Sequence, residues 1–368
     1  MLHSKKPLVT FSHDIFTGQT AGGVSRCMIE LMRALGELGV NWSGWAGQND
    51  NAMLQEVMSK PWARNNIFSV QSQHRGRLAA SIAEEPSFAA WVRNNAPSVV
   101  HRTYYPIRDM VGRKVSLVET LHDLWDERSR FRDDRGAVIR SFIKKRACHR
   151  ADAVVCVSEH TRHEAVDRWP SLADKIVVIP HGVRPLSAAP EKAAFDWPYF
   201  LFVGRRSFYK NFLMVANALT QSGLDHKLVC FGGGPLTDHE LRTLSSLKAL
   251  DRIELVFGSD ERLAGLYDDA TALLYPSSFE GFGLPLLEAM IHRCPVISSP
   301  LTSLPEVGGD AVLYADPLSV DNWANAMRKI VEDASLADEL RAKGERRAAQ
   351  FSWAQSAESH KRLYNSLA

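Results

Sequence analysis

The chain has 368 residues, of which 45% are hydrophobic and 23% are charged, and its formal net charge is +2. This length accommodates two domains of ordinary size. The balanced charge gives no support to nucleic acid as a partner, and without a run of 18 apolar residues no transmembrane helix is predicted. Residues 1–7 lack the apolar core of a signal peptide, so we expect a cytoplasmic protein.

Five cysteines are scattered along the chain, and none belongs to a Cys-x-x-Cys pair. We interpret them as reduced thiols and expect neither a disulfide nor a metal site. They are Cys27, Cys148, Cys156, Cys230 and Cys294.

The N-terminal stretch predicts a strand, a glycine pair and a helix. The strand covers residues 8–12, and Gly22 and Gly23 precede a helix over 24–38 in which apolar residues recur at helical spacing. This layout is typical of a loop that cradles phosphate, although a tight turn without a ligand fits the same residues. The Gly-x-Gly-x-x-Gly dinucleotide fingerprint is absent.

Residues 41–97 are less informative, with one strand predicted near 41–46 and one helix over 83–95. The rest of this stretch mixes tryptophans with polar residues and shows no clear period. We expect it to be a variable region.

Two further strands are predicted over 98–101 and 116–121. Tyr104 and Tyr105 follow the first strand, and His122-Asp123 ends the second. Because the carboxyl ends of parallel strands bind ligands, these tyrosines could stack on an acceptor sugar and His122 could contact a ligand. A core or loop role for the tyrosines and a structural role for the histidine fit the sequence as well.

Residues 128–150 are locally basic, and a helix is predicted over 136–150. Its apolar residues can form a stripe that consists of Val138, Phe142, Ile143 and Ala147. A basic amphipathic helix can lie on an anionic membrane surface. The alternative is the solvated face of an ordinary helix that covers a sheet.

The first half closes with strands over 153–157 and 175–179, followed by Pro180-His181-Gly182-Val183. Residues 184–198 combine three prolines with alanines and charges, which is a linker composition. We place the domain boundary and one hinge there.

The second half restarts with a strand over 199–203 and a loop that carries Arg205 and Lys210. Two cations between a strand and a helix can neutralise a diphosphate, although exposed loops also hold cations for other reasons. The next strand, over 227–231, runs into a glycine turn at 232–234.

A strand over 272–275 is followed by a glycine loop and a helix that begins near Pro285. The glycines allow a ligand to approach the backbone closely, and the helix N-terminus attracts an anion. Glu280 lies on the loop and Glu288 in the second turn of the helix. Two carboxylates at different depths can accept hydrogen bonds from hydroxyls of two rings, as in a nucleotide sugar.

The segment Glu280-Gly281-Phe282-Gly283-Leu284-Pro285, with Glu288 after it, resembles the Glu-x7-Glu signature of GT4-family retaining glycosyltransferases, which have the GT-B fold. The Gly-Gly loop, His122-Asp123 and the Arg205 and Lys210 pair resemble further elements of that family. The stretches flanking the Gly-Gly loop are most similar to bacterial mannosyl- and rhamnosyltransferases. The chain departs from the family at His181, where many members have asparagine.

The resemblance implies a site for a nucleotide diphosphate sugar that needs no metal ion or other cofactor. Arg205 and Lys210 would hold the leaving diphosphate, with Arg206 as a substitute for Arg205. Glu280 would bind hydroxyls of the donor sugar, Glu288 the ribose diol, and His122 the transferred sugar. The remaining donor contacts would be Gly22, Gly23, Gly281, Phe282, Gly283 and Leu284.

These features predict an α/β protein of the GT-B fold, with two doubly wound parallel-sheet Rossmann-like domains that face a cleft. The predicted parts are an acceptor-binding domain over 1–186, a donor-binding domain over 196–350 and a terminal helix over 351–368 that crosses back to the first domain. Hinges are expected near 184–198 and 350–353, so that the domains close around the donor.

The implied function is retaining transfer of a hexose from GDP-mannose or a GDP-deoxyhexose to a glycan or lipid-linked acceptor, as in polysaccharide or O-antigen biosynthesis. UDP- and dTDP-sugar donors are alternatives. So is a nucleotide-sugar 2-epimerase of the same fold, which would lack the motif of Glu280 and Glu288. A non-catalytic nucleotide-sugar binder is the third alternative.

Overall fold

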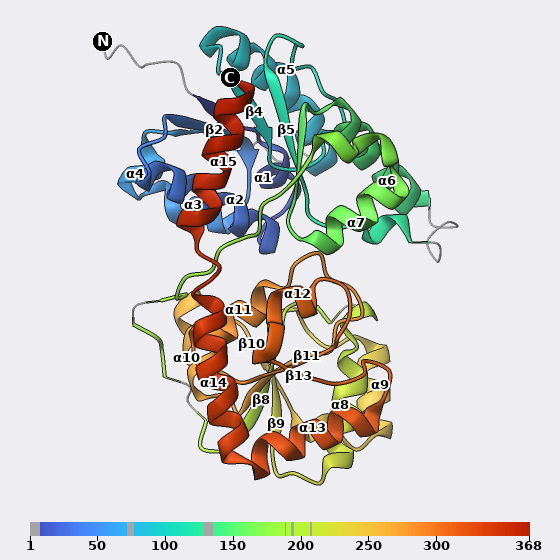
Figure 1. Cartoon of the computed structure of the whole chain (residues 1–368). Coiled ribbons are helices and arrows are strands. Elements are labelled where there is room, and N and C mark those ends of the chain that lie inside the picture. Colours follow the sequence, from blue (N-terminus) through green and yellow to red (C-terminus); the bar gives the residue numbers. More distant parts are fainter. Residues whose placement is uncertain (1–7, 72–76, 129–134, 188, 193–194, 207) are drawn as a thin grey trace. The chain divides into compact units, whose positions relative to one another are not determined.

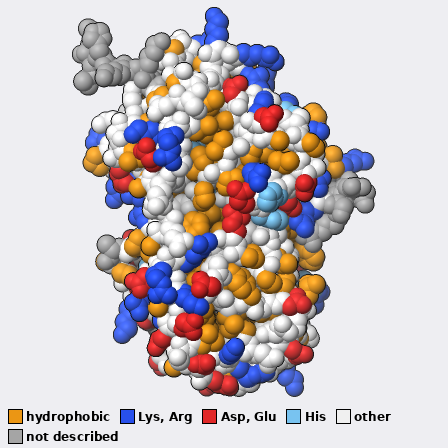
Figure 2. All heavy atoms as spheres, viewed as in Figure 1, with side chains coloured by type: hydrophobic (Ala, Val, Ile, Leu, Met, Phe, Trp, Pro, Cys, Tyr) orange, Lys and Arg blue, Asp and Glu red, His pale blue; other side chains and the backbone are white. Residues whose placement is uncertain are grey.

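The computed structural model describes residues 8–71, 77–128, 135–187, 189–192, 195–206 and 208–368. By its contacts the chain divides into two compact units (Figure 1). The first unit consists of Met1–Gly182 and Trp353–Ala368, and the second unit is Val183–Ser352. Charged side chains of both signs are interspersed on the visible face of each unit, in keeping with the small net charge (Figure 2).

The first unit contains a seven-stranded parallel sheet in the order β3-β2-β1-β4-β5-β6-β7. Most of its strand residues are buried, as expected when helices cover both faces of a parallel sheet. The strands are β1 (Val9–Phe11), β2 (Trp42–Asn49), β3 (Ile67–Gln71), β4 (Val99–Arg102), β5 (Ser116–Leu121), β6 (Ala153–Cys156) and β7 (Ile176–Val178).

Eight α-helices of the described residues belong to the first unit. They are α1 (Asp14–Gly18), α2 (Gly23–Glu37), α3 (Ala52–Met58), α4 (Pro61–Arg64), α5 (Arg77–Asn95), α6 (Arg135–Arg150), α7 (Glu159–Arg168) and α15 (Trp353–Leu367). The terminal helix α15 packs beside α2 (Figure 1). The Tyr364 hydroxyl contacts Nδ1 of the buried His101 at 2.7 Å, which ties this helix to β4.

The second unit contains a six-stranded parallel sheet in the order β10-β9-β8-β11-β12-β13. Its strands are β8 (Tyr199–Val203), β9 (Lys227–Phe231), β10 (Ile253–Val256), β11 (Ala272–Tyr275), β12 (Val296–Ser298) and β13 (Leu313–Tyr314). Its helices are α8 (Phe212–Ser222), α9 (Asp238–Ser246), α10 (Asp260–Asp269), α11 (Leu284–Ile291), α12 (Leu304–Gly308), α13 (Val320–Glu332) and α14 (Ala334–Ala348).

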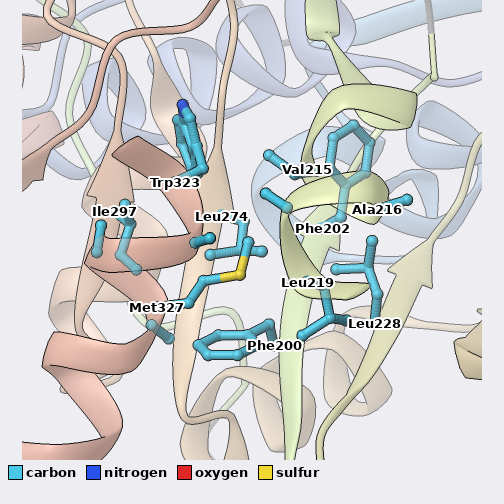
Figure 3. Packing of buried hydrophobic residues seen from close by; sticks show 14 of the residues in the cluster. Phe200, Phe202, Val215, Ala216, Leu219, Leu228, Leu274, Ile297, Trp323 and Met327 are labelled. Atoms are coloured by element: carbon cyan, nitrogen blue, oxygen red, sulfur yellow. The ribbon is translucent and has the colours of Figure 1, made fainter. Parts of the chain in front are cut away.

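The core of the second unit lies between the sheet and the helices α8 and α13 (Figure 3). Phe200 and Leu274 come from the sheet, and Met327 from α13 lies against them. Trp323 is fully buried, and its indole N–H donates to the Asp316 carbonyl at 3.0 Å. This contact lets a large aromatic ring fill the core without leaving a buried donor unpaired.

The order of the strands in both sheets is the doubly wound one, so the predicted α/β class is confirmed. In such a sheet the order reverses at a switch point, which lies between β1 and β4 in the first unit and between β8 and β11 in the second. Loops at the carboxyl ends of these strands diverge and leave room for a ligand. The sequence missed two strands, β3 and the two-residue β13.

The segment before β8 has the composition of a linker, yet its described residues are held against the second unit. The backbone N–H of Glu191 donates to the Glu261 carbonyl at 2.9 Å. The guanidinium of Arg262 contacts the Glu191 carboxylate at 3.0 Å and lies over the Phe195 ring at 5.9 Å. These contacts attach the segment to α10.

Candidate donor site

The loop after β11 brings a glycine turn and a helix N-terminus to the switch point of the second unit. Gly283 is the residue before α11 and has a φ of +108°, a left-handed conformation that favours glycine. A Cβ at this position would also lie 2.7 Å from the Leu304 side chain. Pro285 lies in the first turn, where a backbone N–H is not required. The residues of this loop therefore favour a sharp turn that brings the N-terminal end of α11 to the switch point, where the helix dipole attracts an anion. Within the turn, the Leu286 N–H donates to the Gly283 carbonyl at 3.0 Å.

Lys210 and Glu280 meet at this switch point. Lys210 follows β8 and is 9% exposed, and its ammonium contacts the Glu280 carboxylate at 2.5 Å. The ammonium also donates to the Tyr275 hydroxyl at 2.9 Å and lies 4.5 Å from the centre of that ring. Burial and the neighbouring Glu280 raise the pKa of Tyr275 well above its ordinary value. The tyrosine therefore stays neutral and can accept the hydrogen bond from Lys210.

Arg205 and the glycine turn after β9 line a cavity of about 380 Å³. The three turn glycines have φ values of +83°, +81° and +76°, which a chain with side chains at these positions would rarely adopt. Arg205 is exposed at this cavity, so its guanidinium can reach a ligand. The other lining residues are Arg206, Gly233, Gly234, Pro235, Thr237 and Glu240.

Arg206 holds the glycine turn in place. Its guanidinium contacts the Glu240 carboxylate at 2.9 Å and donates to the carbonyls of Gly234 and Pro235 at 2.8 and 2.7 Å. Glu240 is in turn part of the capping box of α9 with Thr237. In this arrangement the guanidinium of Arg206 is occupied by the turn, and the substitution of Arg206 for Arg205 as a diphosphate ligand stays a prediction.

Glu288 lies in the second turn of α11 and is buried. One of its carboxylate oxygens accepts a hydrogen bond from the Tyr267 hydroxyl at 3.2 Å. Tyr267 stacks on His292, whose imidazole contacts Asp268 at 2.8 Å. A residue of α10 therefore holds Glu288 in place, and Glu288 does not take part in the contact between Lys210 and Glu280. The sequence contained no signal for Tyr267 as its partner.

In the first unit, Gly22 and Gly23 lie at the start of α2. Gly22 is extended, and a Cβ there would come within 2.6 Å of the Gln19 amide. Gln19 accepts a hydrogen bond from the Ser25 hydroxyl at 2.8 Å. This loop is thus closed by its own side chains, and open space surrounds the Cβ position of Gly23. A ligand can approach the backbone there.

His122 follows β5 and is 9% exposed. Its backbone N–H donates to the Tyr105 hydroxyl at 3.3 Å, whereas its buried ring atom Nε2 has no hydrogen-bond partner among the described residues. Burial lowers the pKa of His122 to about 4, more strongly than the nearby Asp123 raises it. At neutral pH the ring is therefore uncharged and can exchange a hydrogen bond with a hydroxyl.

Among the described residues, His13, Asp14 and Glu85 lie close enough together to hold a metal ion. However, the buried Arg102 guanidinium contacts the carboxylates of Glu85 and Asp109 at 2.7 and 2.5 Å and that of Asp14 at 3.5 Å. The cation that balances these carboxylates is thus a side chain. No sequence pattern indicated this cluster, because its members come from distant parts of the chain.

The structure corrects the predicted apolar stripe of α6. Ala147 is buried and Ile143 half-buried, whereas Val138, Ile139 and Phe142 are exposed. The predicted cation Lys144 is buried and contacts Glu127 at 3.0 Å, and Arg146 donates to the Pro106 carbonyl at 2.8 Å. No helix of the described residues has the length and apolar character needed to cross a membrane.

Two family models of glycosyltransferases match the chain, one over each half. Residues 187–347 match the family model "Glycosyl transferases group 1", and residues 21–185 match "Glycosyltransferase Family 4". The chain thus belongs to the glycosyltransferases that these two models describe.

Relatives with known names include two bacterial O-antigen proteins. The O-antigen chain mannosyltransferase B of Escherichia coli is 33% identical over 219 residues, which are 55% of this chain and 58% of the relative. The O-antigen chain mannosyltransferase RfbU of Salmonella typhimurium is 28% identical over 191 residues, 51% of this chain and 54% of the relative. The matches thus span little more than half the length of these relatives.

Solved structures share the fold over nearly the whole chain. Sucrose-phosphate synthase from Thermosynechococcus elongatus has a TM-score of 0.78 at 21% identity and covers 99% of both chains. The Anabaena protein Alr3699/HepE, solved in complex with UDP-glucose, has a TM-score of 0.77 at 16% identity, with 97% of this chain and 99% of that chain covered. The fold is therefore the GT-B fold of glycosyltransferases.

Proposed function

We propose that this protein transfers a hexose from a nucleotide diphosphate sugar to a hydroxyl of a glycan or a lipid-linked oligosaccharide, with retention of the anomeric configuration. The observation that carries the proposal is the contact between Lys210 and Glu280 at the switch point of the second unit, beside the N-terminus of α11. A cation and a helix N-terminus suit a diphosphate. A carboxylate beside them suits the hydroxyls of the attached sugar.

In the proposed reaction, the bond between the anomeric carbon and the phosphate oxygen breaks, and its electron pair leaves with the nucleoside diphosphate. The acceptor oxygen forms its bond to the anomeric carbon on the same face, and its proton passes to the leaving phosphate oxygen. Lys210, Arg205 and the α11 N-terminus offset the charge that develops on the diphosphate. The proposal requires no metal ion, because these groups supply the positive charge.

GDP-mannose or a GDP-deoxyhexose is the proposed donor, since the named relatives are O-antigen mannosyltransferases. UDP- and dTDP-sugars are the rival donors, and a structural relative was solved with UDP-glucose. The proposed role of Glu288 is to bind the ribose diol. Its contact with Tyr267 would hold the carboxylate in place meanwhile.

The test is a panel of GDP-mannose, UDP-glucose and dTDP-rhamnose, applied to the wild type and to Glu288→Ala in a thermal-shift measurement. We expect one sugar nucleotide to raise the melting temperature of the wild type. The same sugar nucleotide should raise the melting temperature of the variant much less. Release of the nucleoside diphosphate on addition of a glycan acceptor would then separate a transferase from a non-catalytic binder. If no sugar nucleotide stabilises the wild type, the proposal is wrong.

We also propose that α6 contacts an anionic membrane surface on which a lipid-linked acceptor is presented. The exposed Ile139 and Phe142, the latter 66% exposed, lie on the same helix as the exposed cations Arg135 and Lys145. Apolar side chains between cations are the combination that binds anionic lipid.

The membrane proposal is tested with the double variant Ile139→Glu and Phe142→Glu in co-sedimentation with vesicles of phosphatidylglycerol and phosphatidylcholine. We expect binding to be lost, whereas Leu318→Glu, at a position that is 82% exposed in the second unit, should leave it unchanged. Equal binding by all three proteins would reject α6 as the contact. Lys144 is left unaltered because its buried ion pair supports the fold.

A further inference from the structure

His181 lies where the chain leaves the first unit, and its ring contacts two residues of that unit that are distant from it in sequence. It follows β7 and is buried. Its ring stacks on His122 with a centroid distance of 5.8 Å and an interplanar angle of 26°. It also contacts the ring of Trp353, the first residue of α15, at 5.7 Å and 40°. We refer to these three side chains as the His122–His181–Trp353 row.

The position of the His122 ring depends on this packing. Its Nε2 atom is buried and has no hydrogen-bond partner among the described residues, so no bond at that atom fixes the ring. The hydrogen bond between His122 and Tyr105 involves the backbone N–H of His122 and orients the chain only. Packing against a neighbouring ring can restrict the remaining rotation of an imidazole.

The charge state of the row is compatible with close stacking. Burial lowers the pKa of His122 to about 4, and burial together with His122 and His360 lowers the pKa of His181 well below its ordinary value. Two neutral imidazoles can lie face to face without repulsion. An asparagine at position 181, as in many members of the resembling family, would present a short polar side chain and no ring face.

We propose that His181 is a positioning residue for His122. Its ring, itself packed against Trp353, holds the neutral His122 imidazole so that Nε2 can exchange a hydrogen bond with a hydroxyl of the donor sugar. This inference rests on the proposed function, since it supplies a specific support for the contact between His122 and the transferred hexose. His181, in the segment that leaves the first unit, would thus contribute to sugar recognition indirectly, through His122.

The experiment compares His181→Ala, His181→Phe and His122→Ala with the double variant His122→Ala/His181→Ala. For each protein, calorimetry gives the affinity for the sugar nucleotide that best stabilises the wild type in the panel above, and for its nucleoside diphosphate alone. Turnover of the same donor gives kcat and KM. Far-UV circular dichroism shows that each variant is folded.

We expect His181→Ala to lower kcat about tenfold and to weaken binding of the sugar nucleotide. Binding of the nucleoside diphosphate alone should not change, because only the contact with the sugar is misplaced. His181→Phe should restore most of the loss, since it retains a ring. In the His122→Ala background, His181→Ala should cause no further loss, because the residue to be positioned is gone.

Two results would overturn the inference alone. One is an equal loss from His181→Ala with and without His122, and the other is an unimpaired His181→Ala beside an impaired His122→Ala. If His122→Ala itself turned over normally, the proposed sugar contact of His122 would fall together with the inference. If His181→Ala does not fold, Trp353→Phe takes its place, because it loosens the same row. Its effect is measured by the same two affinities, for the sugar nucleotide and for the nucleoside diphosphate.

Discussion

The switch points of the two sheets occupy equivalent places in their units but differ in chemistry. Between β1 and β4 lies Arg102, with 0% exposure and three carboxylates around it. Between β8 and β11 lie Lys210 and Glu280, whose side chains keep 11% and 15% exposure. The doubly wound order fixes where a ligand can bind. Burial then decides whether the charges there serve the fold or remain accessible to a ligand.

The other polar groups follow the same division. In the first unit, burial keeps His122 neutral, which suits contact with an uncharged sugar. In the second unit, the exposed Arg205 lines the cavity beside the glycine turn after β9, and the N-terminus of α11 follows the loop that carries Glu280. A cation and a helix N-terminus suit a diphosphate. Under the proposed function, the first unit contributes sugar recognition and the second unit anion binding, although their sheets have the same topology.

The largest expected effect concerns the buried cluster of the first unit. Arg102→Met would leave the carboxylates of Asp14, Glu85 and Asp109 without their cation, at a cost of about 3–5 kcal/mol in the free energy of unfolding. Denaturant unfolding followed by circular dichroism measures this change. The matched control is Arg33→Met on α2, since Arg33 forms a partly exposed pair with Glu30, which contributes at most about 1 kcal/mol. Equal costs for both variants would mean that the cluster does not support the fold.

At the other switch point the expected loss is in turnover. Lys210→Met preserves the length of the side chain but removes the charge that is proposed to meet the leaving diphosphate, so kcat should fall about 10²–10³-fold. Stability should change less than in Arg102→Met, because Glu280 is partly exposed. The control is Lys343→Met, which removes a surface contact with Glu339 in the same unit. Turnover by Lys210→Met within threefold of the wild type would remove Lys210 from the proposed mechanism.

A third prediction concerns pH and the buried histidines of the first unit. Burial lowers the folded-state pKa of His122 and of His360 to about 4, below the ordinary value of about 6.5. The unfolded chain therefore takes up protons first as the pH falls. Stability that is fully present above pH 6.5 should be lost between about pH 6.5 and 4, on the order of 3 kcal/mol for each histidine.

Unfolding curves at pH 7.5, 6 and 4.5 measure this loss for the wild type and for His360→Phe, a variant that keeps a ring beside His101 and Tyr364. The variant should lose less stability over the same range. Burial raises the pKa of Glu119, which titrates in the opposite sense, so the difference between the two proteins isolates the histidine. Identical pH profiles would show that His360 does not contribute.

Much of this comparison could be predicted from the sequence, but in an uneven way. The strand and helix pattern and the glycine loop were predictable, because local patterns and a short motif carry them. The contact between Lys210 and Glu280 was not predicted, and their roles toward a donor stay predictions. The Arg102 cluster was not predictable, since its partners Asp14 and Glu85 are 88 and 17 residues away and only the fold brings them together. Likewise, the pattern of α6 could not show that Lys144 turns inward to Glu127.

The smallest expected difference separates two adjacent arginines at the cavity of the second unit. Arg205→Gln should weaken nucleotide diphosphate binding about tenfold, because one charge-assisted contact is lost, and should leave stability unchanged. Arg206→Gln should instead lower stability by about 1–3 kcal/mol, because the contacts to Glu240 and the Gly234 carbonyl are broken. Calorimetric titration with the nucleoside diphosphate and denaturant unfolding measure the two quantities on the same proteins. The reverse outcome would mean that Arg206 leaves the glycine turn when the donor binds. In that case burial alone would not decide which arginine supports the fold and which binds the ligand, because the role of Arg206 would change when the donor binds.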